Sequence, residues 1–289
     1  MSEGIGVAAA VLSSGLGGTA IGATRLLAGR IDPVTLGFLR FAVGAALLVP
    51  VALLAPRPWP RGRDRAKTAA LGLLFFAVFP CLFNAALALT SAARGALALS
   101  TLPLLTMAVA AILGVERLTL RKSAGVAVAM GGVLLALASG LSLAPPGAWR
   151  GDLLMAAGAF CMAFYNVWSR PLIRRSAVLP YTATGMACGA GALFAVSLAT
   201  GGAARLSQLA AAEWLAVAYL GIVGAAVTFW LWAWALDRAT PTRVATTVTV
   251  NPVTAAIFGL LLLGEPVPPP LLGGLAAVAV GIWIASRPG

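Results

Sequence analysis

The chain has 289 residues, of which 61% are hydrophobic and only 10% are charged, and its formal net charge is +12. Soluble domains carry about 25% charged residues, so this composition excludes a water-soluble fold and indicates a membrane protein. The basic residues are scattered in short stretches between apolar runs, which excludes the continuous basic face of a nucleic-acid-binding domain.

Ten apolar runs follow one another along the chain, and each is close to the roughly 20 residues that cross a bilayer as a helix. We therefore predict an all-α membrane protein with ten transmembrane helices. Their expected ranges are 5–28, 33–55, 67–89, 95–115, 123–143, 151–169, 180–200, 214–234, 244–263 and 271–286. With the N-terminus in the cytoplasm, most of the 20 Lys and Arg residues fall on the cytoplasmic side, so the positive-inside rule predicts that both termini are cytoplasmic. The basic, proline-rich loop 56–65 is interpreted as a topology anchor, with a site for anionic lipid as the alternative.

The chain contains two copies of one unit at an offset of 149 positions. The recurring pairs are Gly72 and Gly221, Arg94 and Arg243, Pro103 and Pro252, Glu116 and Glu265, Gly125 and Gly274, and Gly132 and Gly281. A fixed period indicates repeated structural units. We predict a first repeat over residues 1–143, a linker over 144–150 and a second repeat over 151–289. Because five helices per repeat is an odd number, the second copy enters the bilayer from the opposite side, which gives the inverted-topology repeats of many secondary transporters.

Three short motifs carry a resemblance to a known family. They are Phe38-Leu-Arg40-Phe41 in the second helix, Glu116 followed by Gly125 and Gly132, and Glu265 followed by Gly274 and Gly281. The chain resembles the EamA repeat of the drug/metabolite transporter superfamily, once in each half, and within it the YddG-type amino-acid exporters. The resemblance implies a ten-helix carrier of the bacterial inner (plasma) membrane, with a central cavity between its halves and efflux of small metabolites.

Arg40 is a charged residue inside the second predicted helix, about 10 Å from its start. A charge at this depth is costly and is by default a functional hypothesis. The guanidinium either attracts a carboxylate-bearing substrate, reaches the outer interface, or pairs with Asp32 or with helix-end carbonyls. The second half has no basic residue near Ala187 to match it.

Aromatic residues and one amide form the first set of candidate binding residues. The members are Phe79, Phe83 and Asn84 in the third helix, Tyr165 and Trp168 in the sixth, and Trp230 in the eighth. Such rings suit a cavity for apolar, aromatic or cationic groups. Ordinary helix packing, or a membrane-interface belt in the case of Trp168, explains them about equally well.

Pro103 and Pro252 lie near the middle of the fourth and ninth helices. A proline inside a helix removes a hydrogen bond and kinks the helix, so each is a candidate hinge. The polar side chains nearby are candidate ligands for a polar substrate at the membrane midplane, and they are Ser100, Thr101, Thr246, Thr249 and Asn251. The alternative is that the hydroxyls bond back to their own helices and the prolines are fixed bends.

The remaining reactive residues predict little chemistry inside the membrane. Histidine is absent, and Cys81, Cys161 and Cys188 lie in apolar segments, so we expect free thiols, no metal site and no cofactor. Glu116 and Glu265 close the fourth and ninth helices, where we expect structural contacts. Because no Asp or Glu falls in mid-membrane, we predict no enzymatic activity, and facilitated diffusion rather than proton antiport.

Together these features predict a secondary transporter that exports amino acids, aromatic or apolar ones among them, or related small metabolites by alternating access. Its expected partners are a small-molecule substrate and the lipid bilayer, without nucleic acid, and we expect a monomer or weak homo-oligomer. One alternative is an exporter of drugs, nucleosides or other small metabolites. Another, of a different class, is a lipid-handling protein or scramblase.

Overall fold

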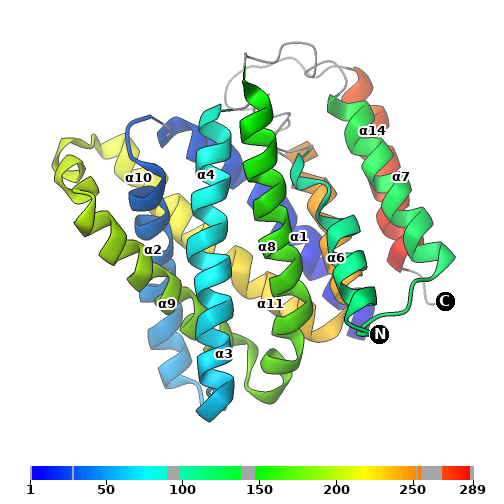
Figure 1. The fold of residues 1–289 in the computed structure, drawn as a ribbon, viewed down its shortest axis with the longest axis horizontal. Coiled ribbons are helices and arrows are strands. Elements are labelled where there is room, and N and C mark those ends of the chain that lie inside the picture. The colour runs from blue at the N-terminus through cyan, green and yellow to red at the C-terminus, as the bar shows by residue number, and fades with distance from the viewer. Residues whose placement is uncertain are drawn as a thin grey trace.

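The helices run up and down in one bundle, and the two chain termini lie at the same end of it (Figure 1). The structure is a computed structural model that describes residues 2–27, 29–89, 98–137, 147–251, 253–254 and 269–286. Its elements in chain order are α1 (Ser2–Leu27), α2 (Pro33–Leu54), α3 (Gly62–Leu73), η1 (Leu74–Val78), α4 (Phe79–Leu89), α6 (Leu102–Ile112), α7 (Leu120–Leu137), α8 (Ala148–Arg175), α9 (Val178–Ala199), η3 (Gly202–Gln208), α10 (Ala211–Gly221), η4 (Ile222–Val227), α11 (Thr228–Arg238), α12 (Pro241–Thr246), η5 (Thr247–Val250) and α14 (Pro269–Ser286). Arg94, Pro252 and Glu265 lie outside the described residues.

Five of the described helices are long and apolar enough to cross a membrane. They are Glu3–Thr24, Pro33–Leu54, Gly62–Leu89, Val178–Ala199 and Ala211–Arg238. The shorter apolar helices Leu102–Ile112 and Ala276–Ala285 fall in two further predicted spans. The predicted all-α membrane class is therefore confirmed for the part of the chain described, whereas the number of ten helices and the inverted arrangement stay predictions.

Polar residues decide where several helices begin and end. The Oδ1 atom of Asp32 accepts hydrogen bonds from the backbone N–H groups of Val34 (3.1 Å) and Thr35 (2.9 Å), so Asp32 caps the start of α2. α3 begins at Gly62 and α8 ends at Arg175, each several residues beyond the predicted apolar run. Outside the hydrocarbon a helix no longer needs apolar side chains, so stretches rich in Arg continue these helices into the interface.

Two pairs of segments depart from α-helical geometry, and they fall at equivalent places in the two repeats. The third helix contains the π-helical turn η1, and the eighth contains the π-helical turn η4. The fourth helix is interrupted by a turn at Ser100 and Thr101, and the ninth by the 3-10 segment η5. Such irregularities inside long helices often mark functional sites or hinges.

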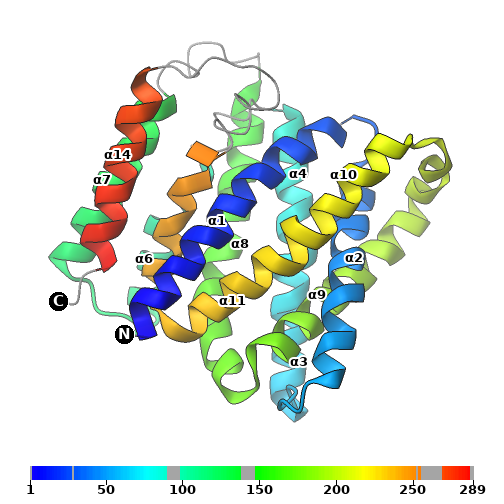
Figure 2. The same cartoon turned by 180° about the vertical axis from the view of Figure 1, so that it is seen from behind.

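Small residues bring α7 and α14 together at one side of the bundle (Figures 1 and 2). A Cβ atom added to Gly125 would lie 2.5 Å from the backbone N of Ala285, and one added to Gly281 would meet the backbone of Ala129. Glycine permits this approach because it has no side chain. Gly125 and Gly281, two of the glycines that recur in the repeats, therefore pack α7 against α14 within one chain.

Replacing Gly125 with Leu is expected to destabilise the protein by about 1–3 kcal/mol, because the new side chain would overlap the backbone of α14. Gly131→Leu is the matched control, since Gly131 lies on the same helix and a Cβ there meets nothing within 4 Å. The measurement is the thermal unfolding midpoint of the purified protein in detergent. Equal midpoints for the two variants would contradict the assigned α7–α14 contact.

Candidate functional site

A cavity lies at the centre of the bundle, where residues of both repeats meet. The volume of this cavity is about 70 Å³. This is room for a few water molecules and less than the roughly 300–1,000 Å³ of typical ligand pockets, so the helices are drawn closely around the centre in this conformation. The lining residues are Ser13, Ser14, Gly17, Ile21, Arg40, Phe41, Phe79, Pro80, Phe83, Leu99, Met162, Thr228, Phe229, Trp232, Val248 and Asn251.

Much of this lining consists of pairs related by the 149-residue offset. The pairs are Ser13 and Met162, Phe79 and Thr228, Pro80 and Phe229, Phe83 and Trp232, and Leu99 and Val248. The cavity is therefore built by equivalent surfaces of the two repeats. The chemistry of the pairs differs. The position of Ser13 in the first repeat is held by Met162 in the second, and the position of Phe79 is held by Thr228.

The irregular backbone segments supply this lining. Phe79 and Thr228 are the first residues after the π turns η1 and η4. Leu99 directly precedes the turn that interrupts the fourth helix, and Val248 lies within η5. Irregular backbone at membrane depth is tolerated where it is buried in protein or lines a cavity. All four irregular segments here adjoin or contain a residue that lines the cavity.

Arg40 brings a positive charge to the cavity. One of its terminal nitrogens, Nη2, donates a hydrogen bond to the carbonyl oxygen of Gly224 in η4. The guanidinium carbon lies 5.5 Å from the ring centre of Phe41 and 5.7 Å from that of Phe229, distances suited to cation–π attraction. Its Nε atom is buried and has no hydrogen-bond partner within the described part of the chain. Asp32 is engaged at the start of α2, so among the described acids none forms an ion pair with Arg40.

Polar groups of α1 and of the ninth helix also border the cavity. The Ser13 hydroxyl donates to the carbonyl of Thr228 (2.8 Å), and the Ser14 and Thr247 hydroxyls share a hydrogen bond of 2.9 Å. The Oδ1 atom of Asn251 is buried, and the described residues give it no hydrogen-bond donor. Among the side chains described around the cavity, Arg40 thus has a donor and Asn251 an acceptor without a hydrogen-bond partner.

An aromatic layer of Phe75, Tyr165 and Phe229 lies beside the cavity. The ring of Phe75 stacks on Tyr165 with centres 3.9 Å apart, and it meets Phe229 edge-on at 5.2 Å. α3 starts at the end of the bundle that holds the termini (Figure 1). Phe75 precedes the cavity-lining Phe79 by four residues along the same helix, about 6 Å, so it lies on the terminus side of Phe79.

The structure brings four of the predicted site residues into one cavity, namely Arg40, Phe79, Phe83 and Asn251. The remaining predicted residues lie elsewhere. The Thr101, Thr246 and Thr249 hydroxyls donate to carbonyls of their own helical segments, at 2.7–2.8 Å. This is the back-bonding alternative that the sequence left open.

The other predicted residues pack around the cavity or away from it. The amide of Asn84 donates to the carbonyl of Pro33 (3.0 Å) and so ties α4 to the start of α2. Ser100 is buried beside the cavity-lining Leu99 without lining the cavity itself. Tyr165 belongs to the aromatic layer, and Trp230 is partly buried outside the cavity lining. Trp168 is 45% exposed and lines a separate groove.

Pro103 occupies the first turn of α6 and not the middle of a continuous helix. Its missing N–H costs little there, because the first N–H groups of a helix have no intrahelical partner. The break at Ser100 and Thr101 directly precedes it, so the fourth helix does bend at this place. The predicted partner hinge, Pro252, lies outside the described residues.

Glu116 makes the structural contacts predicted for it. Its Oε1 accepts a hydrogen bond from the backbone N of Thr242 (3.0 Å) at the start of α12, and its Oε2 pairs with Lys122 (2.6 Å). The carboxylate therefore links the connection before α7 to the N-terminus of α12, where a negative charge is favourable.

Several lining residues were not predicted from the sequence, among them Ser13, Thr228, Phe229 and Trp232. A signal for two of them was present. Adding the repeat offset of 149 to Phe79 and Phe83 points to Thr228 and Trp232. The aromatic residue predicted in the eighth helix was Trp230 instead.

Comparison with known proteins agrees with this architecture. The family described as EamA-like transporter family matches residues 4–138 and again residues 149–287. The uncharacterised transporter YyaM of Bacillus subtilis is 26% identical over 89% of this chain and 86% of its own length. A probable terminal-alkyne amino-acid exporter of Streptantibioticus cattleyicolor is 28% identical over 79% of this chain and 75% of its own length. One solved crystal structure superposes with a TM-score of 0.78 at 23% identity, covering 98% of this chain and 96% of that one, which indicates a shared fold.

Proposed function

Because the chain belongs to the EamA-like transporter family, we propose that it is an exporter of amino acids or closely related carboxylated metabolites. The transported molecule occupies the central cavity. Its carboxylate binds Arg40, its amino group faces Asn251, and its side chain lies among the aromatic rings. The relative named as a probable amino-acid exporter supports this choice over drugs or nucleosides.

One observation carries the proposal, namely the state of the Arg40 guanidinium. A buried positive charge in a membrane protein normally pairs with an acidic side chain or with backbone carbonyls. Arg40 has a carbonyl partner at Nη2 and an unpaired Nε, and it faces a cavity in which no described lining residue is acidic. A substrate carboxylate would complete this pairing with a charge-assisted hydrogen bond.

We propose an inverted arrangement of the repeats, with alternating access at the central cavity. Three features support it. The paired lining residues come from equivalent positions of both repeats. α1 packs on α11, and its counterpart α8 packs on α4, the counterpart of α11. α8 also starts at the end of the bundle opposite the termini, so the two halves begin on opposite sides (Figures 1 and 2).

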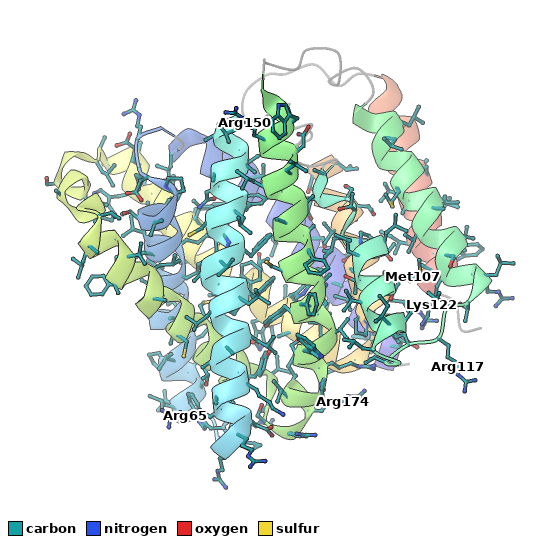
Figure 3. All side chains as sticks on the ribbon, in the orientation of Figure 1. Arg65, Met107, Arg117, Lys122, Arg150 and Arg174 are labelled. Carbon is teal, nitrogen blue, oxygen red and sulfur yellow. The ribbon has the colours of Figure 1, made fainter. Side chains whose placement is uncertain are left out.

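The proposed orientation places the termini in the cytoplasm of a bacterial cell. In Figure 3 the labelled Arg65, Arg117, Lys122 and Arg174 lie toward the end of the bundle with the termini, and Arg150 lies at the other end. Basic residues are enriched on the cytoplasmic side of membrane proteins, so this distribution supports the orientation.

Arg40→Met is expected to weaken transport of an amino acid more than transport of the corresponding amide, which lacks a carboxylate. Loss of one charge-assisted hydrogen bond should raise the KM for the acid by about tenfold or more, with a much smaller change for the amide. The measurement is uptake of both labelled compounds into proteoliposomes. An equal loss for acid and amide would reduce Arg40 to a structural role, and Arg40→Lys tests whether charge alone suffices.

We propose that the fourth helix bends at the break before Pro103 when access alternates. Pro103→Ala would allow residues 98–112 to form one continuous helix, so we expect slower flux from a protein that still inserts and purifies normally. Pro50→Ala is the matched control, because Pro50 lies inside α2 and is exposed. Unchanged flux in Pro103→Ala would remove the hinge role.

The transport class is tested with the pure protein in liposomes. We expect uptake of labelled apolar and aromatic amino acids to follow their own gradients without a pH gradient, because no described residue that lines the cavity can carry a proton on a carboxylate. Nucleosides and a cationic dye serve as competing substrates. Transport of these alone, or transport of amino acids only with a pH gradient, would overturn the proposed substrate or the proposed mode.

A further inference from the structure

A second hollow lies at the terminus end of the bundle, between the first turns of α3 and the last turns of α8. Its volume is about 460 Å³, within the roughly 300–1,000 Å³ range of ligand pockets. Its walls are mainly apolar and are formed by Leu71, Trp168, Pro171 and Leu172. Two basic residues, Lys67 and Arg175, also line it. All lining residues belong to this end of the two helices, so the groove does not cross the bilayer.

Positive charge borders the groove on both helices. Lys67 of α3 and Arg175 of α8 line it directly. A smaller hollow of about 180 Å³ shares Arg175 with the groove and adds Arg61 and Trp59. Asp64 is the acid of this cluster, and it lies 3.2 Å from Arg175, whose side chain is 64% exposed. An exposed ion pair of this kind contributes at most about 1 kcal/mol, so an incoming anion can compete for Arg175.

Aromatic rings lead from the groove along the outer face of α8. Phe160, Phe164 and Trp168 follow one another at intervals of four residues, with neighbouring ring centres 4.7 Å apart in each case. Phe160 and Trp168 are 46% and 45% exposed, so this face of α8 is not covered by the described residues. Exposed rings in such a position contact acyl chains, and a Trp near the end of the row is typical of the membrane interface.

We propose that this groove binds an anionic phospholipid. The phosphodiester lies between Lys67 and Arg175, and one acyl chain follows the row of rings on α8. Basic and apolar surfaces adjoin here in the order in which a phospholipid presents its headgroup and its chain. A soluble anion lacks the apolar part, and a zwitterionic lipid gains less from two cations. The inference concerns a site separate from the central cavity and does not depend on which substrate is transported.

Native mass spectrometry of the purified protein with phosphatidylglycerol or phosphatidylcholine of equal chain length tests the proposal. We expect a preference of about tenfold or more for phosphatidylglycerol, from two basic side chains near the headgroup. Lys67→Gln combined with Arg175→Gln should bring the two lipids to within about twofold of each other. Arg63→Gln combined with Arg65→Gln is the matched control, since it removes the same charge from the same end of the bundle without touching the groove.

Two further arms separate lipid binding from structure and from simple anion binding. Asp64→Asn breaks the same ion pair as Arg175→Gln but leaves the Arg175 cation, so it should strengthen the preference for phosphatidylglycerol. If the ion pair had only a structural role, both variants would lose that preference. Glycerol phosphate without acyl chains should not displace the lipid. Equal binding of both lipids, an equal loss in the control double variant, a weaker preference in Asp64→Asn, or displacement by glycerol phosphate would overturn the proposal.

Discussion

Inside a bilayer every backbone N–H and C=O group must find its partner within the protein, and the centre of this molecule is organised by that constraint. Carbonyl groups in and directly after the π turn η4 accept hydrogen bonds from side chains. Thr228 donates to the carbonyl of Val223 (2.7 Å), Arg40 donates to that of Gly224, and Ser13 donates to that of Thr228. These donors come from α1, from α2 and from the helix itself, so the irregular turn joins three helices at one point. The cavity lies where these partners converge.

The two repeats meet the same constraint in different ways. At the position of α9 equivalent to Arg40 stands Gly189, and a Cβ atom there would lie 3.0 Å from the carbonyl oxygen of Phe76 in η1. One repeat therefore supports its π turn with a charged side chain, and the other with close backbone packing. As a result Arg40 is the one cation among the described residues that line the cavity. A site with a single positive charge and a buried amide oxygen suits a ligand with one negative and one positive group, whereas a multiply charged anion would need more cationic donors.

The sequence predicted the class of protein, the repeat and four residues of the central cavity, and it missed most of the rest of the lining for physical reasons. Hydropathy reports on the bilayer and the recurring Glu and Gly residues report on the repeat, so they indicated the membrane class and the two copies, whereas the contact between α7 and α14 was not predicted. Side-chain direction depends on helical phase, and an α-helical period carried across η1 and η4 gives the wrong phase. Trp230 was chosen as an aromatic residue of the eighth helix, whereas Trp232 lines the cavity. Hydroxyl groups at Thr246 and Thr249 were named for their chemistry, yet each is used by its own helix.

The π turns also have a consequence for how these helices tolerate change in length. A π turn holds more residues than an α turn, and one residue rotates an α-helix by about 100°. Everything beyond η1 or η4 is therefore rotated relative to the part before it, and this rotation turns Phe83 and Trp232 inward. Loss of a single residue from either turn would leave a longer run of ordinary helix with the same composition and the same hydropathy. The face that now lines the cavity would, however, point toward a neighbouring helix or toward lipid. The number of residues in η1 and η4 therefore decides which side chains line the cavity.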